Sequence, residues 1–340
     1  MKFSPIIGKR ETIAYLLSKS GLLKLCETIQ MGEGPLIVLA YHGVRNIVAR
    51  GYPFDEGTVS ASCEQFDLQM RFVKNNFDVI TFKTLREVLE GKIALPKRPL
   101  LITFDDGFAD NYGNAFPILR NYNLSAAIFL VTGLVGTKEI FWWERVAYWF
   151  KKTDFFKVWK QLGHGVPVPE NKTQKFVLRY LKDMKDNERL SFLTELEKRF
   201  PIIESEVILS QIRPLKWEEI LEMSRYGIEF GSHTVTHPVL SKVSEEKLHF
   251  ELTASKREIE SKIGKEVLAI AYPVGGPSDY NEKVIDMAKQ AGYLFGLSYS
   301  PCDVNDREVN DWYRIKRISI EADHSFNRFR SYLSLPALIQ

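Results

Sequence analysis

Residues 100–107 read LLITFDDG, an apolar run that ends in two adjacent aspartates and a glycine. An unbroken apolar run of this length predicts a strand buried on both faces, as in a parallel sheet. Asp105 and Asp106 would then follow the carboxyl end of that strand. Adjacent carboxylates near an apolar core repel each other and lose hydration, and a bound cation removes this cost. A helix N-cap pair or a solvated turn is the structural alternative.

Other short apolar runs have the same character as 100–104. They lie at 36–41, 77–82, 126–131, 228–231, 267–272, 293–297 and 317–320. Helical patterns alternate with them, at 64–75, 83–91, 113–121, 244–263 and 281–291. This alternation predicts an α/β fold, either a (β/α) barrel or a doubly wound sheet. A barrel places its chemistry at the carboxyl ends of the strands.

Residues 137–215 interrupt the alternation and are rich in Phe, Trp, Lys and Glu. We interpret them as a helical insertion between two parts of one domain, 36–136 and 216–340, which follow an N-terminal helical segment, 1–35. The insertion opens with FWWE (141–144), which predicts either packing on the barrel or a wall of the substrate cleft. Residues 12–30 predict an amphipathic helix packed on the domain. A membrane-surface contact of this helix is possible but not favoured.

The composition excludes several classes of protein. The 340 residues carry 46 basic and 43 acidic side chains, a balance that argues against a nucleic-acid partner. Three cysteines far apart in the chain argue against a disulfide framework or a cysteine zinc site. No apolar stretch approaches the roughly 20 residues that span a bilayer, and no secretory signal is apparent. The predicted location is therefore cytoplasmic.

Three more motifs follow predicted strands. In GSHTVTHP (231–238), His233 and His237 would share one face of a single helical turn, a common spacing for a shared metal ion. In YPVGG (272–276), a glycine-rich turn could direct backbone N–H groups at an oxyanion, or could simply connect strand and helix. His42, in AYHGV (40–44), is either catalytic or a buried structural histidine.

The motifs TFDDG, SHTVTH and AYPVGG, in this order, resemble those of the NodB-type polysaccharide deacetylases of carbohydrate esterase family 4. The resemblance covers roughly 36–136 and 215–322, and it implies a distorted (β/α)7 barrel. The early Tyr-His pair and the late Arg-Ile strand are similar to the branch that includes biofilm poly-N-acetylglucosamine deacetylases and enzymes of exopolysaccharide gene clusters.

The resemblance also implies roles for individual residues. Asp105 would be the catalytic base, and His42 the general acid. One divalent ion, with Zn²⁺ preferred and Co²⁺, Ni²⁺ or Fe²⁺ possible, would be held by Asp106, His233 and His237. The backbone N–H of Val274 would form the oxyanion hole, within a substrate-binding turn made of Tyr272, Pro273, Val274 and Gly275.

The sequence departs from the family pattern in three places. Many members carry an arginine two residues before the proline, where this chain has Ala271, and Arg317 is the candidate substitute that contacts the base. The late Leu-x-His motif has no clean match, and His324 is a second candidate for the acid. The Asp-Trp pair at 311–312 precedes a strand rather than following one.

The expected function is metal-dependent removal of N-acetyl groups from amino sugars of a polysaccharide or glycolipid precursor, with release of acetate. The expected partner is therefore an N-acetylated glycan. Two alternatives remain open. One is a Mg²⁺-dependent phosphoryl-transfer or phosphodiester enzyme that uses the Asp105–Asp106 pair. The other is a non-catalytic carbohydrate-binding relative.

Overall fold

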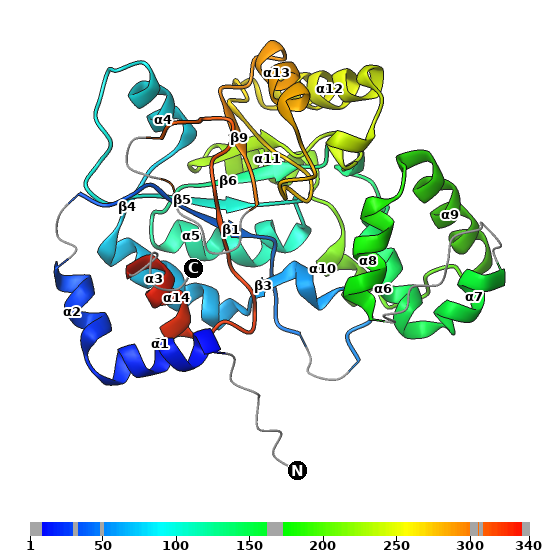
Figure 1. Cartoon of the computed structure of the whole chain (residues 1–340), viewed down its shortest axis with the longest axis horizontal. Helices are drawn as coiled ribbons and strands as arrows, with labels where there is room; N and C mark the ends of the chain where they lie inside the picture. Colours follow the sequence, from blue (N-terminus) through cyan, green and yellow to red (C-terminus); the bar gives the residue numbers. More distant parts are fainter. Residues whose placement is uncertain are drawn as a thin grey trace.

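The computed structural model describes residues 9–29, 33–47, 51–161, 173–299, 305 and 309–334. An eight-stranded parallel sheet forms its centre, in the order β10-β1-β5-β6-β7-β8-β9, with β4 also paired to β5 (Figure 1). The strands are β1 (Ile37–Tyr41), β4 (Asp78–Val79), β5 (Pro99–Phe104), β6 (Ala126–Leu130), β7 (Ile228–Ser232), β8 (Ala269–Ala271), β9 (Phe295–Leu297) and β10 (Ile318–Ser319). Every strand predicted from an apolar run is confirmed.

The sheet curls, and the chain just before β10 links its two edges. The N–H of Ile315 donates to the carbonyl oxygen of Gly296 in β9 at 2.9 Å, and the N–H of Ser298 donates back to Ile315 at 2.9 Å. The same segment then enters β10, which pairs with β1 through Ile318 and Leu39. The predicted distorted barrel is thus confirmed as a curled, incompletely closed parallel sheet with helices around it.

Both faces of the sheet are buried, as the unbroken apolar runs predicted. In β5, Leu100 and Ile102 belong to one apolar cluster and Leu101 to another. Much of the cover comes from α3 (Cys63–Asn76), α4 (Phe82–Leu89), α5 (Phe116–Asn121), α11 (Trp217–Ser224), α12 (Glu245–Ile263), α13 (Glu282–Gln290) and α14 (Phe326–Ser334). A small second sheet joins β2 (Gly43–Val44) to β3 (Val59–Ala61).

The helices between residues 142 and 212 pack around an apolar cluster of their own and extend to one side of the sheet (Figure 1, green). They are α6 (Trp142–Lys152), α7 (Phe155–Gln161), α8 (Gln174–Asp183), α9 (Asp186–Arg199) and α10 (Glu206–Ile212). All lie within the range interpreted as an insertion, 137–215. The cluster also includes Phe54 and Phe108, which precede β3 and follow β5. The helices of the predicted insertion therefore pack directly on the loops that hold Phe54 and Phe108.

The prediction of one continuous helix over residues 12–30 is wrong. Two helices, α1 (Lys9–Lys19) and α2 (Leu22–Ile29), meet at Gly21, whose φ of 76° ends the first helix in a left-handed conformation. α1 packs against α14, and Ala14 is fully buried there. Ile13 and Leu16 on the same helix are 43% and 59% exposed. None of the helices described is long and apolar enough to cross a bilayer.

Candidate active site

Backbone strain concentrates where the predicted motifs follow β5, β7 and β8. Five described residues other than glycine have positive φ, and four of them lie in these motifs: Asp106 (71°), Thr234 (69°), His237 (56°) and Val274 (63°). A left-handed conformation at such residues costs of order 1–3 kcal/mol each, and it persists only where surrounding contacts impose it. The three loops are thus held in conformations that a free chain would seldom adopt.

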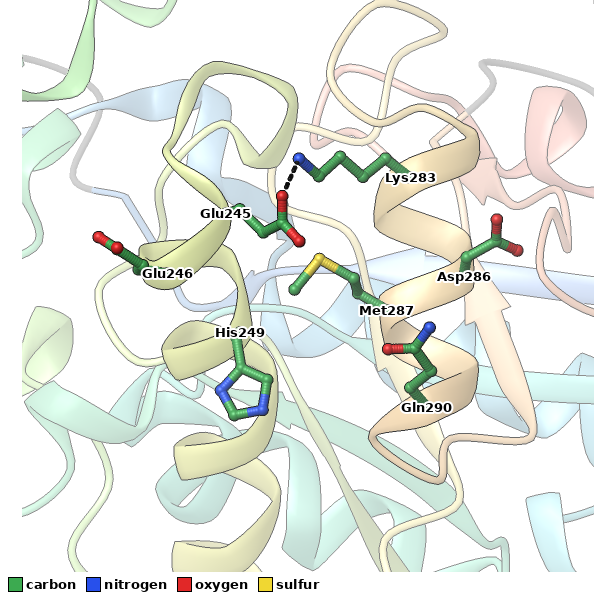
Figure 2. Close-up of a pocket in the computed structure, with 7 residues that line it drawn as sticks. All are labelled: Glu245, Glu246, His249, Lys283, Asp286, Met287 and Gln290. Atoms are coloured by element: carbon green, nitrogen blue, oxygen red, sulfur yellow. Dashed lines mark hydrogen bonds and ion pairs between the residues drawn. The ribbon is translucent and has the colours of Figure 1, made fainter.

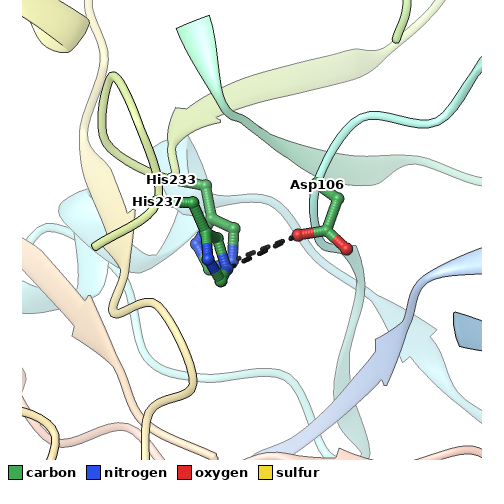
Figure 3. A group of neighbouring side chains, drawn as sticks. All are labelled: Asp106, His233 and His237. Carbon is green, nitrogen blue, oxygen red and sulfur yellow. Dashed lines mark ion pairs between the residues drawn. The ribbon is translucent and has the colours of Figure 1, made fainter. Parts of the chain in front are cut away.

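These loops bring together the three predicted metal ligands (Figure 3). One carboxylate oxygen of Asp106, Oδ1, lies 3.6 Å from Nε2 of His233 and 3.7 Å from Nε2 of His237. Two zinc–ligand bonds of about 2.1 Å that meet at a tetrahedral angle place the ligand atoms about 3.4 Å apart. All three side chains are buried. The set therefore fits a single ion that takes two imidazoles and one carboxylate.

The contacts of the two imidazoles differ. Nδ1 of His233 lies 2.8 Å from the carbonyl oxygen of Ala271, and a proton on Nδ1 leaves the Nε2 lone pair facing Asp106. Nδ1 of His237 has no hydrogen-bond partner among the described residues. The indole of Trp143, at the start of α6, instead packs against the imidazole of His237, with ring centroids 4.3 Å apart. The aromatic opening of the insertion thus contacts one of the predicted metal ligands directly.

The two histidines do not share a helical turn, and that expectation is wrong. Residues 233–238 form a loop after β7, and the sequence analysis missed the residue that shapes it. The buried carboxylate of Glu251, in α12, accepts hydrogen bonds from the N–H groups of Val235 (2.7 Å) and Thr236 (2.9 Å) and from the Thr236 hydroxyl (2.5 Å). The sequence signal that could have pointed to Glu251 is its place on the same helical face as Leu248 and Leu252, both of which are buried.

Burial controls the charge of the triad. It raises the pKa of Asp106 well above its usual value, and the neighbouring carboxylate of Asp105 raises it further. Burial also lowers the pKa values of His233 and His237. The imidazoles are therefore neutral and able to ligate, whereas the Asp106 carboxylate needs a nearby cation to stay ionised. A divalent ion at the triad would supply that charge.

Asp105 has a different partner. The guanidinium of Arg317, on the approach to β10, donates from Nη1 and Nη2 to its two carboxylate oxygens at 2.7 and 2.8 Å. Nε of Arg317 donates to the carbonyl oxygen of Ser298 at 3.1 Å, which fixes the guanidinium plane. Burial alone would raise the pKa of Asp105, but Arg317 lowers it to about 2. This carboxylate therefore stays ionised beside the triad.

His42 lies near the same groups. Its backbone N–H donates to Oγ of Ser60 at 2.8 Å, and its backbone carbonyl oxygen accepts from Nδ2 of Asn111 at 2.8 Å. The imidazole interacts electrostatically with Asp105 and His233, and burial lowers its pKa to about 4. The imidazole is thus neutral at pH 7.

His324, the second candidate for the acid, has other surroundings. Its ring packs on Tyr332 of α14, with centroids 5.4 Å apart, and its Nε2 lies 3.7 Å from Asp323. The pKa of His324 falls to about 4 through burial and the nearby charge of Arg328. Trp312 of the late Asp-Trp pair packs on Phe295 in the core. The contacts of neither side chain include a triad residue.

The turn over 272–275 has one unused backbone donor. The N–H of Val274 forms no hydrogen bond with another described residue, whereas that of Tyr272 donates to Leu297 at 3.0 Å. A Cβ on Gly275 would lie 2.8 Å from the backbone nitrogen of Tyr299, so only glycine fits there. The Tyr272 hydroxyl donates to a carbonyl oxygen outside the turn, at 3.0 Å. This tyrosine therefore supports the turn from the core.

A surface hollow between α12 and α13 is separate from these residues (Figure 2). An ion pair of 2.6 Å between Glu245 and Lys283 crosses one end of it. Its lining residues are Glu245, Glu246, His249, Lys283, Asp286, Met287 and Gln290. None of them belongs to the triad or contacts it.

Comparison with known proteins identifies the family. The model of the family described as polysaccharide deacetylase matches residues 92–296. The chain belongs to the polysaccharide deacetylase family. It is 35% identical over 309 residues to the poly-beta-1,6-N-acetyl-D-glucosamine N-deacetylase of Staphylococcus aureus, covering 86% of this chain and 80% of that protein.

Solved structures confirm the deacetylase fold. The deacetylase PplD of Streptococcus pyogenes, in complex with acetate, superposes with a TM-score of 0.60 at 18% identity, covering 88% of this chain and 99% of that one. IcaB from Ammonifex degensii superposes with a TM-score of 0.56 at 18% identity, covering 91% and 98%. The predicted family and enzyme class are confirmed, and this polysaccharide deacetylase is a hydrolase.

Proposed function

We propose that this polysaccharide deacetylase removes N-acetyl groups from an amino-sugar glycan and releases acetate, with one divalent ion held by Asp106, His233 and His237. The proposal rests on one observation: the triad of suitable ligand atoms lies beside a second carboxylate, that of Asp105. This carboxylate is ionised, and it is hydrogen-bonded to Arg317 rather than to the triad. The named activity of the Staphylococcus aureus relative favours a β-1,6-linked N-acetylglucosamine polymer as the substrate.

The donor set indicates which ion would be bound. Two imidazoles and a carboxylate suit Zn²⁺, with Co²⁺, Ni²⁺ or Fe²⁺ as alternatives, because nitrogen ligands favour these ions over Mg²⁺. When bound, such an ion polarises the acetyl carbonyl and lowers the pKa of a water molecule to about 7. Three protein ligands would leave coordination positions open for the water and for the acetyl oxygen.

Asp105 would take the proton from the attacking water. Its pKa of about 2 keeps it ionised, and the two hydrogen bonds from Arg317 orient the carboxylate. The free N–H of Val274 would donate a hydrogen bond to the oxygen that becomes negative as the water attacks. The role of Arg317 is therefore to position the base, and the turn over 272–275 supplies the oxyanion donor.

His42 would deliver a proton to the leaving nitrogen. Because its pKa is about 4, the imidazole is neutral at the start and must first gain a proton. That proton would be the one that Asp105 takes from the water, since the pKa of Asp105, about 2, lies below that of His42. His324 is less suited, since its contacts lie with α14.

The competing functions fit the geometry less well. A Mg²⁺ site needs several oxygen ligands. Both carboxylate oxygens of Asp105 accept hydrogen bonds from Arg317, so the triad offers Mg²⁺ only one carboxylate. A non-catalytic sugar-binding protein has no need for a positioned base, a free N–H and an ion site together. The hydrolase assignment explains all three features.

The decisive experiment measures acetate release from a panel of N-acetylated glycans, with the metal content of the protein determined in parallel. We expect release from a β-1,6-linked N-acetylglucosamine oligosaccharide, loss of release with a chelator, and recovery with Zn²⁺ or Co²⁺. Undiminished release after complete metal removal would exclude the metal mechanism. The predicted cytoplasmic location and the lack of a nucleic-acid partner stay predictions.

A further inference from the structure

The insertion brings a lysine close to the triad. Lys182, in the last turn of α8, interacts electrostatically with Asp106 and His237, and also with His42. These three residues follow three different strands. One ammonium group that acts on all of them must lie near the place where their loops meet.

Contacts at both ends of α8 fix the position of this lysine. At the first turn, Nε2 of Gln174 donates to Oδ1 of Asp55 at 2.8 Å. At the last residue, the carboxylate of Asp183 lies 3.6 Å from Nζ of Lys242, on the chain after the histidine loop. Leu181 is fully buried in the insertion cluster. Lys182 therefore sits on a helix anchored to the loops around the site (Figure 1).

The ammonium group of Lys182 has no direct partner among the residues that the structure describes. It forms no hydrogen bond or ion-pair contact with any of them, although the side chain is half-buried. Burial lowers its pKa, and the carboxylates of Asp55, Asp106 and Asp279 oppose that change from a distance. A desolvated ammonium without a hydrogen-bond acceptor is unfavourable, and an acceptor on a bound molecule removes the cost.

The groups around Lys182 indicate the chemistry of that molecule. Asp55 and Asp279 come from the loop before β3 and from the turn after Val274, and both interact with the ammonium. An ammonium donates hydrogen bonds and carboxylates accept them, and a sugar hydroxyl does both. A hydroxyl-rich sugar ring therefore fits this set.

We propose that Lys182 is a substrate contact that the insertion supplies: its ammonium donates hydrogen bonds to hydroxyl or ring oxygens of the amino sugar whose acetamide lies at the triad. The inference rests on the proposed function and deepens it. The helical insertion then contributes to sugar recognition, besides packing against His237 through Trp143.

The test compares Lys182→Met, Lys182→Arg and Lys157→Met on two substrates. Lys157 is an exposed lysine on α7, farther from the sheet, and serves as the matched control (Figure 1). The substrates are a β-1,6-linked N-acetylglucosamine oligosaccharide and an aryl acetate ester, which carries no sugar. Acetate release by the unmodified protein from the oligosaccharide is measured first, because its absence would refute the proposed function itself.

We expect Lys182→Met to raise KM for the oligosaccharide about 10- to 100-fold, the effect of a lost hydrogen bond to a charged group. Hydrolysis of the ester should stay within about three-fold, and Lys182→Arg should recover part of the loss. The control should behave as the unmodified protein. The inference is overturned if KM is unchanged, if kcat alone falls, or if both substrates lose rate equally, because the lysine would then act on the reacting groups or on folding.

Discussion

Arg317→Met tests the most specific electrostatic feature of the site. The substitution keeps an apolar stem in a buried position and removes the guanidinium that donates to both oxygens of Asp105. The carboxylate is then left buried without a cation. We expect its pKa to rise from about 2 to above its ordinary value of 3.8, because burial is the largest influence on it.

The size of the effect on stability follows from the pKa. A folded-state value of about 2 against 3.8 in the unfolded chain corresponds to roughly 2.5 kcal/mol of stability. Because the folded pKa is the lower one, this contribution is fully present above about pH 4 and is lost as the pH falls through 2. At pH 7, Arg317→Met removes it and leaves an uncompensated buried charge, a change that typically costs about 3–5 kcal/mol.

The assay is denaturant unfolding at pH 7 together with the pH profile of kcat/KM. Arg314→Met is the matched control, since Arg314 is a partly exposed arginine that pairs with Asp311 and Glu282 at the surface. The control should cost about 0–1 kcal/mol and leave the pH profile unchanged. Arg317→Met should also move the acidic limb of the profile to higher pH. Equal stability losses for the two variants, with no movement of the acidic limb, would refute this account of Asp105.

Further substitutions test the other proposed roles. Asp105→Asn should retain the metal by elemental analysis while kcat falls about 10²–10⁴-fold, and near-full activity would remove Asp105 as the base. His233→Ala should abolish the rise in Tm on adding Zn²⁺, which for the unmodified protein corresponds to about 2.7 kcal/mol at 100 times Kd; an unchanged rise would exclude His233 as a ligand. His42→Gln should lower kcat about 10²–10⁴-fold on the glycan but far less on an aryl ester, whose leaving group needs no proton. Equal losses on both substrates would contradict the role of His42 as acid.

The local sequence predicted the secondary structure best in segments that are buried on both faces. The apolar runs predicted every strand of the sheet, because a strand covered on both faces must be apolar at successive positions. The helical pattern predicted over 244–263 agrees with α12, whose start is capped by the Ser244 hydroxyl as it accepts from the N–H of Lys247. The single helix over 12–30 failed because its periodicity continues across Gly21, and only the left-handed φ there separates α1 from α2.

The sequence by itself determined the alternation of strands and helices and the identity of the polar residues at the strand ends, since both follow from local patterns of side chains. Only the tertiary structure decided which groups meet. The sequence offered Arg317 only as a candidate contact of Asp105, and the fold brings the two together across 212 positions of the chain. The packing of Trp143 on His237 and the hydrogen bonds by which Glu251 shapes the histidine loop were not predicted. Such pairings depend on how a curled sheet places its strand ends and on where an insertion packs, and no local pattern of residues records either.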